Sequence, residues 1–107
     1  MEAFGAIAQP TRREILRLLA GGELSVGAVA SRFPVTQPAI SQHLKVLREA
    51  GLVEERRAGT RRLYRVRREG LTDLHEFLAS FFDEGLERLK ELAEAEERSD
   101  GRDAERN

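Results

Sequence analysis

Apolar residues recur along this chain at the spacing of amphipathic helices, and one stretch alternates as strands do. This spacing predicts helices over a short N-terminal segment around Phe4 and Ile7 and over residues 10–20, 25–33, 36–50 and 70–97. A β-hairpin is predicted over residues 52–66, where residues 58–60 supply a glycine-containing turn. The pattern therefore predicts a mainly α fold with one small β-hairpin, in the order α-α-α-α-β-β-α.

The segment TQPAISQHLKVLREAGLV, residues 36–53, is the most informative part of the chain. Thr36 is a good N-cap, because its hydroxyl can accept a hydrogen bond from a first-turn amide, and Pro38 is tolerated in that turn. Gly51 is expected to end the helix in a left-handed conformation. Between these ends, one apolar stripe is formed by Ile40, Leu44 and Leu47.

The opposite face of this helix is polar. It carries Pro38, Ser41, Gln42 and Lys45, with Gln37 and Arg48 at its flank. A helix that buries one stripe and presents small hydrogen-bonding side chains with a cation suits a DNA major groove. An ordinary amphipathic surface helix has the same pattern, so the neighbouring segments decide between the two.

Both neighbours favour DNA binding. Residues 25–33 predict a short helix with Ser25 as its N-cap, and Pro34-Val35 turns the chain into the next helix. Two short helices joined by a tight turn make a helix-turn-helix, whose second helix reads the groove. Because a hairpin follows, the whole arrangement predicts a winged helix-turn-helix.

The predicted wing is strongly basic. Residues 56–68 contain no acid and seven arginines, namely Arg56, Arg57, Arg61, Arg62, Arg65, Arg67 and Arg68. Arginine pairs with phosphate in bidentate fashion and can enter a narrow minor groove. The alternative is a solvated basic hairpin that binds no partner. The hairpin follows a helix that suits a DNA groove, which argues against this alternative.

The net charge of −1 hides an asymmetry along the chain. Residues 1–70 hold 13 Lys and Arg against 7 Asp and Glu, a balance of +6, whereas residues 71–107 hold 5 against 12, a balance of −7. The excess of basic residues that favours nucleic-acid binding therefore lies in the first two thirds of the chain. The chain has no cysteine, which excludes disulfides and thiolate metal ligands. No apolar run is long enough to span a membrane and no signal peptide is visible, so a cytoplasmic location is expected.

The long C-terminal helix has a wide apolar stripe that a domain of this size is not expected to cover. We therefore expect a symmetric dimer through this helix and the N-terminal segment, although the helix could instead fold back on its own domain. The expected interface consists of Phe4, Ile7, Leu74, Phe77, Leu78, Phe81, Phe82 and Leu89. Residues 1–97 are expected to form one DNA-binding and dimerisation domain, and residues 98–107 a disordered polar tail.

The chain resembles the ArsR-type winged-helix repressors over about residues 3–92. The resemblance is carried by residues 9–16 (QPTRREIL), 37–47 (QPAISQHLKVL), 50–53 (AGLV) and the hairpin residues 59–64 (GTRRLY), in this order and spacing. It implies a homodimer that occupies a promoter and blocks transcription until a signal releases it.

Departures from the family pattern bear on metals. Metal-sensing members have Glu-Leu-Cys-Val-Cys-Asp-Leu where this chain has ELSVGAV at residues 23–29, so both thiolates are absent. Asp73 and His75 match half of a zinc site known in another branch, but the second half lacks histidine and offers only Glu84 or Glu87. The resemblance therefore points to the metal-independent branch, which has tryptophans where Phe77 and Phe82 stand, and no cofactor is expected.

The residue roles follow from the helix face and the wing. The expected base-reading residues are Gln37, Pro38, Ser41 and Gln42, and His43 turns toward the core side of its helix. The expected phosphate contacts are Thr36, Lys45, Arg48, Arg57, Arg61 and Arg62. Double-stranded operator DNA and a second copy of the chain are the expected partners.

Other functions remain open at this stage. An enzyme is excluded, because the chain has two histidines on separate helices, no cysteine and no phosphate-binding glycine loop. A zinc-responsive repressor using Asp73 and His75 is one alternative, and a winged-helix protein-interaction module is another. Neither the operator, nor the release signal, nor repression as opposed to activation follows from the residues.

Overall fold

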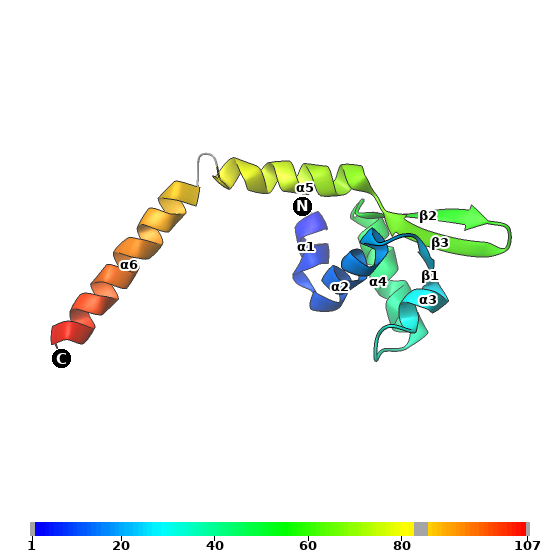
Figure 1. Ribbon diagram of the computed structural model, residues 1–107, viewed down its shortest axis with the longest axis horizontal. Helices are drawn as coiled ribbons and strands as arrows, with labels where there is room; N and C mark the ends of the chain where they lie inside the picture. The colour runs from blue at the N-terminus through cyan, green and yellow to red at the C-terminus, as the bar shows by residue number, and fades with distance from the viewer. Residues whose placement is uncertain (1, 83–85, 107) are drawn as a thin grey trace. The chain divides into compact units, whose positions relative to one another are not determined.

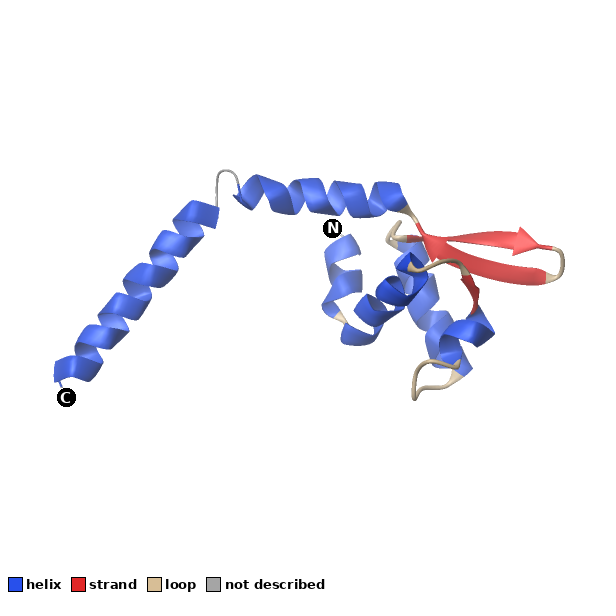
Figure 2. Ribbon diagram, in the orientation of Figure 1, coloured by secondary structure: helices blue, strands red, loops and turns tan. Residues whose placement is uncertain are grey.

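The structure is a computed structural model that describes residues 2–82 and 86–106, with side chains described for residues 2–82 and 87–97. The elements in chain order are α1 (Glu2–Ala8), α2 (Pro10–Ala20), β1 (Leu24–Ser25), α3 (Val26–Ala30), α4 (Gln37–Glu49), β2 (Val53–Ala58), β3 (Arg61–Val66), α5 (Arg68–Ser80) and α6 (Leu86–Arg106) (Figure 1). The chain divides between Asp73 and Leu74 into two compact units. The first unit is the winged helix-turn-helix that the sequence predicts (Figure 2).

Side-chain caps define where the helices begin. The Thr36 hydroxyl accepts from the Ala39 amide at 3.2 Å, and the Ser25 hydroxyl accepts from the Ala28 amide at 3.2 Å. Both predicted N-caps are confirmed. A third cap was not predicted: the Gln9 side chain accepts from the amide of Arg12 at 2.9 Å. Each cap satisfies a first-turn N–H that the helix itself leaves unpaired.

The core joins the helices to the root of the wing. Its fully buried side chains come from α2, α3, α4 and the start of β2: Ile15, Val29, Ile40, Leu44, Leu47, Leu52 and Val53. Leu19 is also buried, whereas its neighbours Leu16 and Leu18 are half-buried. Each large aliphatic side chain removed from water contributes about 1.5–3 kcal/mol.

A three-stranded antiparallel sheet of order β1-β3-β2 forms the wing and its root. The predicted hairpin is confirmed, with Val53 opposite Val66 and Ala58 opposite Arg61. Gly59 has a φ of 65° in the turn, a region that glycine adopts without strain. Strand β1 was not predicted, because two residues cannot show alternation. It pairs Leu24 with Tyr64 and Ser25 with Leu63.

Two arginines at the start of α2 secure the N-terminal helix. Arg12 Nε donates to the Ala6 carbonyl at 2.7 Å, and Arg13 Nη1 donates to the Ile7 carbonyl at 2.8 Å. The same two side chains also reach the carbonyls of Gly5 and Ala8. The last four carbonyls of a helix have no partner within it. Arg12 and Arg13 together satisfy all four at the end of α1.

The junction between the helix-turn-helix and the wing is built on backbone contacts. Gly51 has a φ of 77°, the left-handed conformation predicted at the end of α4. The Arg67 amide donates to the Leu52 carbonyl at 2.9 Å, and Arg67 Nη1 donates to the Gly51 carbonyl at 3.3 Å. Gly70 lies directly on this backbone, so the start of α5 is fixed against the end of α4.

The C-terminal region differs from the sequence prediction. One helix over residues 70–97 was predicted, whereas the structure has α5 and α6 on either side of residues 83–85, which lie outside the described residues. Helix α6 continues to Arg106, and the separate tail from residue 98 stays a prediction. No helix among the described residues is both long and apolar enough to cross a membrane.

We predict that Gly70→Ala destabilises the fold. The added Cβ would fall on the Gly51 carbonyl oxygen and lie 2.9 Å from the carbonyl carbon, both of which are backbone atoms. Overpacking of this kind costs about 1–3 kcal/mol, measured as the free energy of unfolding in urea. Gly27→Ala is the control, because its Cβ would meet only the Gln37 side chain, at 4.0 Å. Equal effects of the two substitutions would show that the Gly70 contact is unimportant.

Candidate nucleic-acid interface

The exposed face of α4 gathers the predicted base-reading residues. Gln37, Pro38, Ser41, Gln42 and Lys45 together line one open hollow. The side chains are exposed because Ile40, Leu44 and Leu47 are fully buried on the opposite side of the helix. Among the described residues, this lining includes amide, hydroxyl and ammonium groups and no carboxylate. The surface therefore offers donors and acceptors without repelling a polyanion.

The beginning of α4 favours a phosphate group. Thr36 is exposed at the N-cap, where the partial positive charge of the helix dipole is concentrated. Its oxygen accepts from the Ala39 amide, which leaves the hydroxyl proton available for a phosphate oxygen. Lys45 lines the same hollow as Ser41 and Gln42. Contacts of Thr36 and Lys45 with phosphate groups of DNA stay a prediction.

One face of the wing has an unfavourable pairing. Arg57 and Arg62 lie directly opposite each other across β2 and β3. Like charges in this position destabilise a sheet. Arg62 has a carboxylate nearby, with Nε 3.5 Å from Glu55 Oε1, whereas Arg57 has no ion pair among the described residues. Arg57 and Arg61, at the turn, are both exposed and able to take phosphate oxygens.

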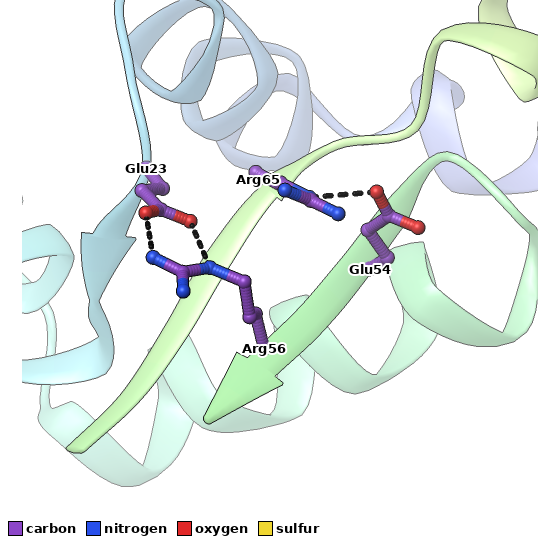
Figure 3. A network of polar contacts seen from close by, with 4 residues as sticks. All are labelled: Glu23, Glu54, Arg56 and Arg65. Carbon is purple, nitrogen blue, oxygen red and sulfur yellow. Dashed lines mark hydrogen bonds and ion pairs between the residues drawn. The ribbon is translucent and has the colours of Figure 1, made fainter. Parts of the chain in front are cut away.

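On the other face of the wing, Arg56 and Arg65 are paired with carboxylates (Figure 3). Arg56 donates through Nε to Glu23 Oε2 at 3.1 Å and through Nη2 to the other oxygen, and Arg65 Nε donates to Glu54 Oε1 at 2.7 Å. The hydrogen bonds from Arg56 lower the pKa of the Glu23 carboxyl below its usual value. Residues 56–68 contain no acid, but Arg56 and Arg65 pair with carboxylates that lie outside this segment. The segment is therefore not a run of unpaired charges.

Arg48 and Arg62, two of the predicted phosphate contacts, share one carboxylate. Arg48 Nη1, on the last turn of α4, donates to Glu55 Oε2 at 2.8 Å, while Arg62 approaches Oε1 of the same side chain. The Glu55 side chain is 18% exposed, less than its partners at 45% and 58%. Glu55 therefore connects α4 to the wing.

His43 lies on the inner side of α4, as its helical position predicted. It is half-buried, with Nδ1 3.5 Å from Arg12 Nη1. Burial, and then the charge of Arg12, lower the pKa of the imidazole below 6.5. Because Arg12 also caps α1, this contact links α1 to α4. Sequence reasoning missed Arg12, since 31 residues separate it from His43.

The predicted dimer residues divide by exposure. The second unit has exposed apolar side chains at five of the predicted positions and, in addition, at Leu92. The five are Phe77, Leu78, Phe81, Phe82 and Leu89. Phe77 and Phe81 pack edge to face with ring centroids 5.2 Å apart. Leu74 is only 6% exposed and has little surface left for a partner. Phe4 and Ile7, on α1, are half-buried.

The predicted zinc alternative gains no further ligand. Asp73 and His75 are both exposed on α5. Within residues 2–82 and 86–106, no group of three or more His, Cys, Asp or Glu side chains could hold a metal ion. Of the two further ligands considered, Glu84 lies outside the described residues and Glu87 lies at the start of α6. Zinc binding stays an untested alternative.

Comparison with known proteins agrees with this geometry. The family described as "Bacterial regulatory protein, arsR family" matches residues 9–55, which run from the α2 cap into β2. The chain is 46% identical over 94 residues to the HTH-type transcriptional regulator Rv2034 of Mycobacterium tuberculosis, covering 88% of each protein. The chain belongs to the arsR family. As an arsR-family protein it is a transcriptional regulator and not an enzyme.

Two further arsR-type proteins extend the comparison. The transcriptional repressor SdpR of Bacillus subtilis is 37% identical over 82 residues, 77% of this chain and 91% of SdpR. The solution structure of Mb0332 from Mycobacterium bovis, described as a homodimeric winged helix-turn-helix DNA-binding domain, superposes with a TM-score of 0.63. It is 38% identical and covers 79% of each chain. The arsR-family fold is thus matched in both sequence and structure.

We predict that the stability of this arsR-family protein falls as pH drops below about 6.5, the ordinary histidine pKa. Since folding lowers the His43 pKa, the unfolded chain takes up the proton first, and the free energy of unfolding decreases until the folded imidazole is also protonated. Urea unfolding between about pH 8 and 5 measures this. His43→Gln should flatten this dependence. The lowered pKa of the Glu23 carboxyl also makes the free energy of unfolding decrease with falling pH, but only below about pH 4.5, so the two effects are separate. An unchanged slope in the variant would contradict the assignment.

Proposed function

We propose that this protein is a homodimeric repressor that binds an inverted-repeat operator through α4 and the wing. The observation that carries the proposal is the exposed face of α4, where Gln37, Ser41 and Gln42 lie together beside Lys45 without a carboxylate in the lining. Side chains of this kind can reach base edges in a major groove, which admits a helix.

Base discrimination is assigned to the two glutamines and Ser41. A glutamine can pair with the N6 and N7 positions of adenine in bidentate fashion, whereas serine accepts several bases. Pro38 supplies an apolar surface in the first turn, suited to the methyl group of thymine. Because the buried stripe of α4 fixes its rotation, these residues approach the groove as one set.

Affinity that does not depend on sequence is assigned to residues around this face. Thr36 and Lys45 are placed to take phosphates beside the groove, and Arg57 and Arg61 extend from the wing. The Arg57–Arg62 repulsion supports this role, because a bound phosphate would relieve it. Each phosphate neutralised releases counterions, so binding should weaken steeply as salt rises.

Dimerisation would place two α4 helices for one operator. The exposed apolar residues of the second unit, led by Phe82 at 61% and Leu92 at 68%, favour association. Mb0332, a relative described as homodimeric, supports the same assignment. Two recognition helices about 34–36 Å apart would enter successive major grooves, which requires an inverted repeat.

Repression is the favoured direction of regulation. A dimer on a promoter blocks polymerase by occupancy alone, without a further contact surface. The relative SdpR, named a transcriptional repressor, supports this direction. The absence of cysteine from the sequence removes thiolate metal sensing as the release mechanism. The operator sequence and the inducer are not assigned.

Selection of duplexes from a random library, at near-physiological salt, tests the function and the role of Gln42 together. Wild type should enrich an inverted repeat with half-sites about one helical turn apart. Gln42→Ala should weaken binding by about 10- to 100-fold for each half-site, the value of one bidentate base contact, and relax the preference at one position of each half-site.

Arg61→Ala is the matched control for Gln42→Ala. It should weaken binding to all duplexes alike and flatten the salt dependence by about one unit per protomer, while leaving the preferred sequence unchanged. A changed preference in Arg61→Ala would reverse the assigned roles. Failure of wild type to enrich any sequence would refute operator binding itself.

We predict that the protein sediments as a dimer at micromolar concentration and that Phe82→Glu shifts it to monomer. A carboxylate would then have to be buried in an apolar interface, which is unfavourable without a partner. Thr72→Glu is the control, because Thr72 is an exposed polar residue of α5 and is not assigned to the interface. A wild-type protein that remains monomeric would exclude the dimer, and a dimeric Phe82→Glu would place the interface elsewhere.

A further inference from the structure

Glu55 occupies a position that a phosphate group could take. Its two oxygens serve different arginines: Oε2 accepts from Arg48 at 2.8 Å, and Oε1 lies 3.5 Å from Arg62 Nε. Arg48 is on the last turn of α4, and Arg62 lies on β3, the central strand of the sheet. Both arginines are among the residues expected to contact DNA phosphates. A carboxylate and a phosphate can each accept two parallel hydrogen bonds from an arginine, so they can replace each other as its partner.

The burial of these side chains favours the internal contact. The Glu55 side chain is 18% exposed, while Arg48 and Arg62 are 45% and 58% exposed. The carboxylate is thus held between the helix and the wing, and the arginines cover it from the solvent side. Val53 begins the same strand and is buried at 1% exposure, which fixes the strand that carries Glu55. DNA would have to draw the arginines away from a carboxylate that cannot follow them.

The charge balance of this surface depends on Glu55. Together with Glu55, the three arginines Arg48, Arg57 and Arg62 have a charge balance of +2, where the arginines alone would have +3. Of these three, Arg57 is the one for which the described part of the chain offers no ion pair. Sequence-independent affinity rises with the number of phosphates neutralised. Base readout by the α4 side chains does not involve Glu55. Glu55 therefore lowers the first contribution and leaves the second unchanged.

We propose that Glu55 is an internal competitor for phosphate, which keeps Arg48 and Arg62 from the DNA backbone and so lowers the affinity of this surface for a duplex of any sequence. The inference rests on the proposed function, because it concerns the same DNA-binding surface. It predicts that neutralising Glu55 raises the affinity for a duplex without an operator and steepens the dependence of that affinity on salt.

The test compares Glu55→Gln with Glu54→Gln in the dimeric, full-length protein. Both substitutions remove one negative charge from adjacent residues of β2, so their effect on net charge is equal. Glu54 lies on the opposite face of β2 and pairs with Arg65. Arg65 also interacts with the Glu23 carboxylate, so Arg65 keeps a negative partner in Glu54→Gln. Binding to a duplex that lacks the selected repeat is measured by fluorescence anisotropy over a salt series.

Glu55→Gln should steepen the salt dependence on this duplex by up to about two units per protomer, since two arginines are released. Affinity at the low-salt end should rise by about tenfold relative to Glu54→Gln. The effect should disappear when Arg48 and Arg62 are also replaced by glutamine. Equal salt slopes for the two single variants, with wild type still binding DNA, would overturn the inference and leave the proposed function intact.

A second pair of variants covers the case in which Glu55→Gln does not fold. Arg48→Gln should reduce non-specific affinity less than Arg57→Gln, because Arg48 is already occupied by Glu55 and Arg57 has no ion pair among the described residues. A larger loss for Arg48→Gln would show that Glu55 does not withhold it from phosphate. Wild type that binds no duplex at low salt would instead refute the proposed function.

Discussion

Burial of one stripe on α4 is the constraint on which the rest of the interface depends. Ile40, Leu44 and Leu47 are each 0% exposed. Withdrawing three such side chains from water contributes several kcal/mol, at about 1.5–3 kcal/mol each. A turn of α4 about its axis would expose this stripe and bury polar side chains without partners. The outward direction of Gln37, Ser41 and Gln42 is therefore a consequence of packing, fixed before any ligand binds.

The wing is then placed against this helix by two independent devices. The backbone contact between Gly70 and Gly51 leaves no room for a side chain at Gly70, so the end of α4 and the start of α5 hold a fixed separation. Glu55 adds an electrostatic connection from the last turn of α4 to β3. The first device sets the distance and tolerates no larger residue. The second contributes less to stability because its arginines are exposed, and so it is available for exchange with a ligand.

The sequence predicted those features that arise from local periodicity. Thr36, the buried stripe and the left-handed Gly51 follow from spacing and capping rules, and the structure has each of them. The pairing of the wing arginines could not be predicted, because Glu23 lies 33 residues from Arg56 and meets it only once β1 joins the sheet. The same holds for Arg12 and His43. The helical spacing of apolar residues is kept from Phe82 to Leu86, so periodicity predicted one helix over 70–97, whereas the described residues fall into α5 and α6.

These contacts change how the arginine content of the wing is interpreted. Three of the seven wing arginines, Arg56, Arg62 and Arg65, have carboxylate partners, and Arg67 is turned inward to the Gly51 carbonyl. A count of basic residues therefore overstates the charge that DNA would meet. What remains exposed is a small cationic set beside a polar helix face. Since phosphate contacts carry no sequence information, such a surface must obtain much of its affinity from base edges, which is the condition for selective binding.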